Sequence, residues 1–167
     1  MISILGYIFV GIVMLFLLTA LTGAPYVPSK RQETREAFTT LRPLTAEDTV
    51  LDIGSGDGAV LREVAKTSAR AVGYEINPIL VGISWLRLRH YRKTVRVKLR
   101  NFWWAPFPEE TTVVYVFGDS RDIKKIYRKV EKEARRLDKR IDLVSFGFAV
   151  PDQKAVATHR AYFLYRV

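Results

Sequence analysis

The sequence predicts an α/β protein in which a mainly parallel seven-stranded sheet carries helices on both faces, preceded by one N-terminal transmembrane helix. Three observations lead to this expectation. Short apolar strands alternate with helical segments through most of the chain, the first strand runs directly into a glycine-rich turn, and residues 1–29 carry no charged side chain at all. All charged residues lie after residue 29, so the N-terminal segment is expected in lipid and the rest of the chain in water.

The N-terminal segment, residues 2–21, is almost wholly apolar. As a helix rising about 1.5 Å per residue, it is long enough for the hydrocarbon core of a bilayer, which is about 30 Å thick. A cleaved signal peptide is the main alternative, but no basic residue precedes the apolar run. We therefore predict a membrane anchor at residues 1–22, a linker at 23–29 that contains two prolines, and a folded domain at 30–167.

Basic residues follow the apolar segment closely, namely Lys30, Arg31 and Arg35. By the positive-inside rule, this asymmetry places the following domain in the cytoplasm. The predicted location is thus the cell membrane, crossed once, with the domain on its cytoplasmic side.

After a short helix that begins near Ser29, strands and amphipathic helices alternate at the spacing of right-handed βαβ units. Strands are predicted at residues 49–53, 70–75, 95–99, 113–117 and 141–148. The helices between them are predicted at 59–67, 78–92 and 120–137. Two closing strands, 155–158 and 161–165, follow each other with no room for a helix between them.

Composition excludes several kinds of site. The 167 residues contain no cysteine and only two histidines, His90 and His159, so neither a disulfide framework, a thiolate metal site nor a cysteine nucleophile is expected. Because the two histidines lie far apart in the sequence, no metal site is predicted.

The most informative stretch joins the first predicted strand to a helix through glycines at 54, 56 and 58. Glycines at such a position permit a tight turn and a close approach of ligand to backbone. Asp52 lies before the turn, and Glu75 ends the next strand, where a carboxylate can accept both hydroxyls of a ribose. Asp52 and Asp57 would repel a pyrophosphate, so S-adenosylmethionine, which carries an ammonium and a ribose, suits the turn better than NAD. A turn that binds nothing is the remaining alternative.

Several motifs resemble the membrane-associated seven-strand (class I) lysine methyltransferases that act on the ATP synthase c subunit and the adenine nucleotide translocase, and their prokaryotic relatives. The matching stretches are Pro25-Tyr-Val-Pro28-Ser29, Leu51-Asp-Ile-Gly-Ser-Gly-Asp-Gly58, Ala71-Val-Gly-Tyr-Glu-Ile-Asn-Pro78, Asn101-Phe-Trp103 and Val113-Val-Tyr-Val-Phe-Gly118. The resemblance implies a Rossmann-like class I methyltransferase fold, S-adenosylmethionine as methyl donor, and a lysine of a membrane protein as acceptor. The chain departs from the family pattern at Ala59, Asn101 and 118–120.

The resemblance and the expected fold together suggest roles for individual residues. Cofactor contacts are expected from Asp52, Gly54, Ser55, Gly56, Asp57, Gly58, Glu75, Ile76, Asn77, Asn101 and Phe102. Asn101 would pair with the adenine amino group and Phe102 would pack on its ring, with a turn former after the strand as the alternative role for Asn101. Asp119 and Tyr26 are the candidates for catalysis, with helix capping and interfacial anchoring as their structural alternatives.

The net charge of +10 bears on partners. Basic residues crowd the stretch between Glu75 and Glu109, which contains no acid. In a soluble protein this would favour nucleic acid, so methylation of RNA or DNA stays an alternative, beside methylation of a small molecule and a non-catalytic membrane adaptor that keeps the fold. Next to an anchor, the same charge favours an anionic membrane surface, with a membrane-associated protein as substrate.

Overall fold

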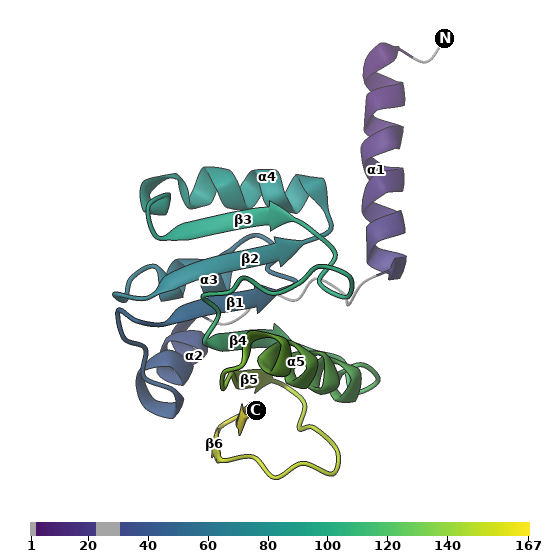
Figure 1. Ribbon diagram of the computed structural model, residues 1–167. Helices are drawn as coiled ribbons and strands as arrows, with labels where there is room; N and C mark the ends of the chain where they lie inside the picture. The colour runs from purple at the N-terminus through teal and green to yellow at the C-terminus, as the bar shows by residue number, and fades with distance from the viewer. Residues whose placement is uncertain (1–2, 23–30) are drawn as a thin grey trace.

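The computed structural model describes residues 3–22 and 31–167 and contains a single seven-stranded sheet flanked by helices (Figure 1). The helical elements are α1 (Ile4–Thr22), α2 (Arg31–Glu36), the π-helix η1 (Ala37–Leu41), α3 (Ala59–Val64), α4 (Pro78–Arg87), the 3-10 helix η2 (Arg89–Tyr91) and α5 (Ile123–Leu137). The strands are β1 (Thr49–Ile53), β2 (Arg70–Glu75), β3 (Val95–Leu99), β4 (Val113–Phe117), β5 (Asp142–Phe146), β6 (Ala157–His159) and β7 (Tyr162–Arg166).

The sheet has the strand order β3-β2-β1-β4-β5-β7-β6. Neighbouring strands from β3 to β5 are parallel, and β7 pairs antiparallel with both β5 and β6. The mainly parallel seven-stranded sheet is therefore confirmed. Its first four strands also have the predicted bounds, because each is a continuous or alternating apolar run with a clear turn after it.

The helices differ from the prediction mainly at their ends. The helix predicted at 59–67 ends at Val64, where the Thr67 hydroxyl donates to the Val64 carbonyl at 2.7 Å and satisfies it locally. The helix predicted from residue 120 begins at Ile123, after a turn in which the Asp119 carbonyl accepts from the amides of Asp122 and Ile123. Side-chain and turn hydrogen bonds of this kind are not visible in the apolar periodicity.

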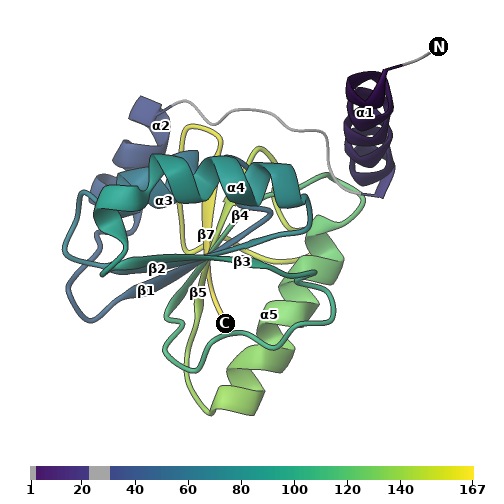
Figure 2. The ribbon, with the colours of Figure 1, turned by 90° about the horizontal axis from the view of Figure 1, so that it is seen from above.

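The two faces of the sheet are covered unequally (Figure 2). One face packs against α2, η1, α3 and α4, with Phe38, Leu61 and Val81 in the core. The other packs against α5, through Ile123, Ile126 and Val130, together with the loops around Phe107 and Val150. The connection between β3 and β4 contains no helix, so its loop and α5 together form the second layer.

The N-terminal helix α1 stands beside the sheet and apart from it in both views (Figures 1 and 2). Its described apolar side chains face outward, and those of Ile4, Leu5 and Phe9 are mostly exposed. Within the described part of the chain, no helix is both long and apolar enough to cross a membrane. The predicted transmembrane helix is therefore not confirmed. The linker predicted at 23–29 lies outside the described residues.

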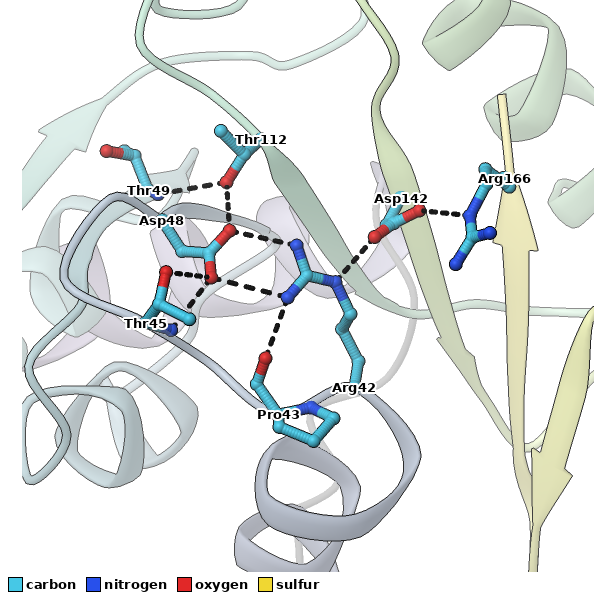
Figure 3. A network of polar contacts seen from close by, with 8 residues as sticks. All are labelled: Arg42, Pro43, Thr45, Asp48, Thr49, Thr112, Asp142 and Arg166. Carbon is cyan, nitrogen blue, oxygen red and sulfur yellow. Dashed lines mark hydrogen bonds and ion pairs between the residues drawn. The ribbon is translucent and has the colours of Figure 1, made fainter.

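A polar network joins the amino ends of the parallel strands, around the guanidinium of Arg42 (Figure 3). This side chain donates to Asp142 Oδ2 at 2.5 Å and to Asp48 Oδ1 at 2.9 Å. Asp48 also accepts from the Thr112 hydroxyl at 2.8 Å and from the Thr45 amide at 2.8 Å. The network thus connects η1, β1, β4 and β5, and it lines a cavity of about 410 Å³ on the edge opposite the glycine turn.

Candidate functional site

The parallel strands β1, β2, β3 and β4 all end at one edge of the sheet, here called the carboxyl edge. Their register places Ile53 opposite both Tyr74 and Val116, and Glu75 opposite Leu99. The predicted cofactor residues lie at these strand ends or just after them, so the structure brings them to one edge of the sheet. In open α/β sheets, ligands bind at this edge.

The glycine turn, residues 54–58, has the left-handed backbone conformation that its three glycines predict. Gly54, Gly56 and Gly58 have φ values of 79°, 54° and 80°. The amides of Gly54 and Ser55 both donate to the Tyr74 carbonyl, at 2.9 Å and 3.0 Å. Further along, the amides of Gly56, Gly58 and Ala59 also donate to protein acceptors. Most of the amides that would cradle a phosphate are therefore already engaged, which disfavours a pyrophosphate at this turn.

Gly73 lets the turn pack directly on β2. A Cβ atom on Gly73 would lie 2.5 Å from the Ser55 hydroxyl oxygen and 2.6 Å from a Leu61 methyl carbon. Only glycine leaves room for this approach. The sequence motif therefore includes a packing requirement on the second strand as well as the glycines of the turn itself.

Asp52 is the most unusual group of the site. Its side chain is buried, with 2% of the residue exposed, and its Oδ2 atom has no hydrogen-bond partner in the protein. The Ser55 hydroxyl, in the turn, is likewise buried and without a partner. Burial, reinforced by the neighbouring Glu75 carboxylate, raises the pKa of Asp52 to about 8. A buried acceptor without a partner suits a ligand that brings a positively charged donor.

Glu75 closes the turn against the end of β2. One of its carboxylate oxygens accepts from the Gly56 amide at 2.8 Å, and the other accepts from the amides of Ile76 and Asn77, both at 2.8 Å. Asn77 then caps α4 by accepting from the Ile79 amide at 2.9 Å. A carboxylate offers about four acceptor positions, so one is left for a ligand hydroxyl.

Asp57 already has partners within the protein. Its carboxylate pairs with Arg87 of α4 and also accepts from the Ala59 amide at 3.2 Å. Asp57 therefore holds the turn against α4 and accepts from the first amide of α3. Its predicted contact with the cofactor stays a prediction, and its charge is balanced within the protein.

Asn101 forms a turn in the structure. Its side-chain oxygen accepts from the Trp103 amide at 3.0 Å, and its carbonyl accepts from the amides of Trp104 and Ala105. Phe102 packs against the core on the α5 face and stacks on Trp103, with ring centroids 4.4 Å apart. The predicted contacts of Asn101 and Phe102 with adenine stay predictions.

A clamp on α5 holds the loop that carries these residues. The buried Glu133 carboxylate accepts from the Phe107 amide at 3.0 Å, from Lys129 at 3.0 Å and from Arg136 at 2.8 Å. Lys129 and Arg136 in turn donate to the carbonyls of Ala105 and Phe107. Burial alone would raise the pKa of Glu133, but these donors together lower it. The clamp takes the place of a helix between β3 and β4.

We expect Glu133→Gln to destabilise the domain by about 2 kcal/mol, because Lys129 and Arg136 lose their counter-charge. Denaturant unfolding measures the loss. Glu131→Gln is the matched control, since Glu131 only meets Arg135 at 3.9 Å on the surface of the same helix. The control should change stability by less than about 0.5 kcal/mol. Equal effects of the two substitutions would contradict the clamp.

At the end of β4, Asp119 is held by its neighbours. Its carboxylate accepts from the Arg121 guanidinium at 2.6 Å and from the Arg121 amide at 2.9 Å, and these bonds hold its pKa far below the usual range. Its side chain makes no capping bond to α5, whose cap position is Asp122. Such a carboxylate is a weak proton acceptor, and Arg121 balances its charge. Tyr26 lies outside the described residues.

Aromatic side chains at this end of the sheet were not predicted as site residues. Phe117 ends β4 and Phe146 ends β5, with ring centroids 5.2 Å apart, and Phe146 packs on Tyr162 at 4.6 Å. Their signal in the sequence is an aromatic residue at the end of each of two apolar strands. In the described residues no group of three or more His, Asp or Glu side chains could hold a metal ion.

Comparison with known proteins identifies methyltransferases as relatives of this chain. A family model described as the ANTKMT methyltransferase domain matches residues 52–157. The lysine N-methyltransferase of the ATP synthase c subunit from Xenopus laevis is 35% identical over 113 residues, which cover 65% of this chain and 48% of that protein. The human protein of the same name is 32% identical over 128 residues, covering 74% of this chain and 52% of its own length. The chain thus spans about half the length of these relatives.

Among solved structures, an RNA methyltransferase from Salinibacter ruber in complex with S-adenosyl-L-homocysteine has a similar fold. The TM-score is 0.73 at 22% identity, and the match covers 84% of this chain and 92% of that one. At this identity the likeness shows the fold, a Rossmann-like class I methyltransferase fold, and the substrate of that enzyme does not carry over.

Proposed function

Because this chain belongs to the ANTKMT methyltransferase domain family, we propose that it transfers a methyl group from S-adenosylmethionine to a lysine side chain of another protein. The observation that carries the proposal is the buried Asp52 carboxylate, which has no partner at Oδ2 and lies beside a glycine turn whose amides are mostly engaged. This site fits an ammonium and a ribose better than a pyrophosphate.

Each residue of the site would have a simple task. The cofactor supplies an activated methyl group on its sulfonium. Asp52 would accept from the cofactor ammonium, the glycine turn would allow close approach of the methionine portion, and the remaining acceptor position of Glu75 would take a ribose hydroxyl. Ile76, Asn101 and Phe102 would border the adenine. Methyl transfer then depends mainly on orienting the acceptor in line with the methyl group.

The acceptor lysine must lose its proton before it attacks, and an apolar surround lowers the pKa of an amine. Phe117 and Phe146 provide such a surround beside the carboxyl edge. Asp119, whose charge Arg121 balances, would orient the lysine amine through a hydrogen bond to its carboxylate. In this arrangement Asp119 positions the acceptor and water takes the proton.

The substrate we propose is a lysine in a membrane-associated protein, as for the relatives named after the ATP synthase c subunit. We also propose that α1 attaches the domain to the cell membrane, as a single anchor with the domain on the cytoplasmic side. The absence of charge in residues 1–29 and the exposed apolar side chains of Ile4, Leu5 and Phe9 support attachment. Since the chain lacks cysteine, single cysteines introduced on either side of α1 would report by labelling whether it spans the bilayer.

Nucleic-acid methylation is the second candidate, favoured by the net charge of +10. The two candidates separate when protein, lipid and nucleic-acid fractions are incubated with the full chain and cofactor labelled in its methyl group. We expect label in protein, and mass spectrometry should place it on lysine. Label confined to RNA or DNA would replace the proposal by the alternative, and no cofactor binding at all would indicate a non-catalytic adaptor.

We expect Glu75→Gln to weaken binding of S-adenosylmethionine about 30-fold, measured by titration calorimetry. Both carboxylate oxygens of Glu75 accept from amides, so a glutamine must turn an NH₂ donor toward a backbone donor and disorder the turn. Glu110→Gln is the control, because Glu110 is exposed and lies away from the turn. Unchanged affinity in Glu75→Gln would remove Glu75 from the cofactor site.

A further inference from the structure

We propose that the β3 edge of the domain docks on the surface of an anionic membrane. The β3 edge is defined here as the outer side of α4, the edge strand β3 and the turn after it, residues 82–104. This inference rests on the proposed membrane attachment and deepens it, because it states which side of the domain faces the lipid.

Tryptophan distribution is the first observation. All three tryptophans of the chain lie at the β3 edge, and all are exposed: Trp85 by 57%, Trp103 by 37% and Trp104 by 84%. Trp85 is fixed against the edge strand, since its indole nitrogen donates to the Val97 carbonyl at 3.1 Å. Large aromatic residues are normally buried in a domain of this size, whereas tryptophan is enriched where proteins meet the lipid interface.

Aliphatic side chains accompany the tryptophans. Leu86 on α4 is 67% exposed and Leu99 at the end of β3 is 56% exposed. They provide apolar surface at the same edge that no described element covers. Lipid acyl chains can take up such side chains, but a nucleic acid has no matching surface for them.

Charge at the β3 edge has one sign. Between Glu75 and Glu109 the chain has no acidic residue, and its basic residues there include Arg89, Arg92, Lys93 and Arg96, all exposed. Arg87 is the exception, because it pairs with Asp57. Each basic residue near an anionic bilayer adds to the attraction. The combination of exposed tryptophans, aliphatic side chains and unbalanced basic charge is what an anionic lipid surface recognises.

Docking in this way would have a consequence for the reaction. The carboxyl edge of the sheet, with the glycine turn and the end of β4, adjoins the turn that carries Trp103 and Trp104. A domain lying on its β3 edge therefore holds the proposed acceptor site close to the lipid surface. Lysines near the headgroups would be reached more readily than lysines far out in the cytoplasm.

Tryptophan fluorescence tests the proposal without added labels, because every tryptophan of the chain belongs to the β3 edge. The full chain is reconstituted in vesicles of phosphatidylcholine alone or with phosphatidylglycerol, each containing a brominated lipid as quencher. We expect a blue shift and strong quenching only with phosphatidylglycerol, and a partial reversal at high salt. The proposed attachment through α1 is the same in both kinds of vesicle. The difference in quenching between them therefore reports docking of the β3 edge.

Charge-reversal variants supply the matched comparison. Arg92→Glu with Arg96→Glu should reduce the docking equilibrium about 30-fold or more, from the attraction of two basic residues. Arg128→Glu with Lys132→Glu, two exposed positions on α5, changes the net charge equally and should leave quenching intact. Equal quenching in both vesicle types, or equal loss in both double variants, would overturn the proposal, as would quenching by RNA and not by lipid. Cofactor affinity, measured separately, should be unchanged in both variants, so failure of docking is distinguishable from failure of the proposed activity.

Discussion

Replacing Asp52 by asparagine is expected to weaken binding of S-adenosylmethionine about 100-fold and to stabilise the ligand-free protein at alkaline pH. The loss follows from removing the buried carboxylate that we propose accepts from the cofactor ammonium, since hydrogen bonds to charged groups contribute about 1.5–3 kcal/mol. The gain follows from removing a group whose ionisation the fold opposes. Calorimetry and thermal unfolding of the full chain measure the two effects.

The pH dependence of the wild-type chain has a definite sign. Asp52 has a pKa of about 8 in the folded protein against about 4 when unfolded. Between these values the folded state keeps a proton that the unfolded state has lost, so Asp52 makes stability fall as pH rises from about 4 to about 8, with no further change above. In Asp52→Asn this contribution disappears.

Cofactor binding should also release a proton. A bound ammonium favours the ionised form of Asp52, so at about pH 6–7 the wild-type chain should release close to one proton on binding, and Asp52→Asn should release none. Calorimetry in two buffers of different ionisation enthalpy measures the release. Asp138→Asn, at an exposed position, is the control. Unchanged affinity in Asp52→Asn, or binding without proton release in the wild type, would contradict the assigned role.

The second large effect concerns stability at the opposite edge of the sheet. We expect Arg42→Ala to lower the free energy of unfolding by about 3 kcal/mol, and Tm by about 6–12 °C. The substitution leaves Asp142 and the buried Asp48 without the cation that lies 2.5 Å and 2.9 Å from them. Arg42→Lys should recover only part of the loss, because one ammonium cannot donate to both carboxylates in the same way.

Acid unfolding provides a further check on the same network. Burial alone would raise the pKa of Asp48, but bonds from the Thr45 amide, Arg42 and Thr112 lower it overall. Its contribution to stability is therefore present above about pH 4 and is lost as pH falls through the lowered pKa. Arg42→Ala should show a weaker acid dependence than the wild type. Arg140→Ala, in the same cavity, is the control and should change stability little.

The sequence alone predicted the order of the elements along the chain well. β1 to β4 have the predicted bounds, and the glycine turn has the positive φ angles that its composition requires. These features depend on local periodicity and turn chemistry, which a single sequence records directly. The family resemblance, carried by the glycine turn and by the Gly73–Pro78 stretch, was likewise a property of contiguous residues.

Only the tertiary structure decided which partners the charged and aromatic side chains have. Asp57 pairs with Arg87, Glu75 accepts from the turn amides, Glu133 clamps the loop after β3, and Phe117 meets Phe146. Arg42 and Asp142 are 100 residues apart in the chain, yet they form an ion pair. Such pairs arise from the path of the backbone through the sheet and from which face each side chain occupies. Neither the path of the backbone nor the face of a side chain can be read from a short stretch of sequence. The sequence therefore determined where the glycine turn forms, and the fold determined which acids beside the turn have partners within the protein.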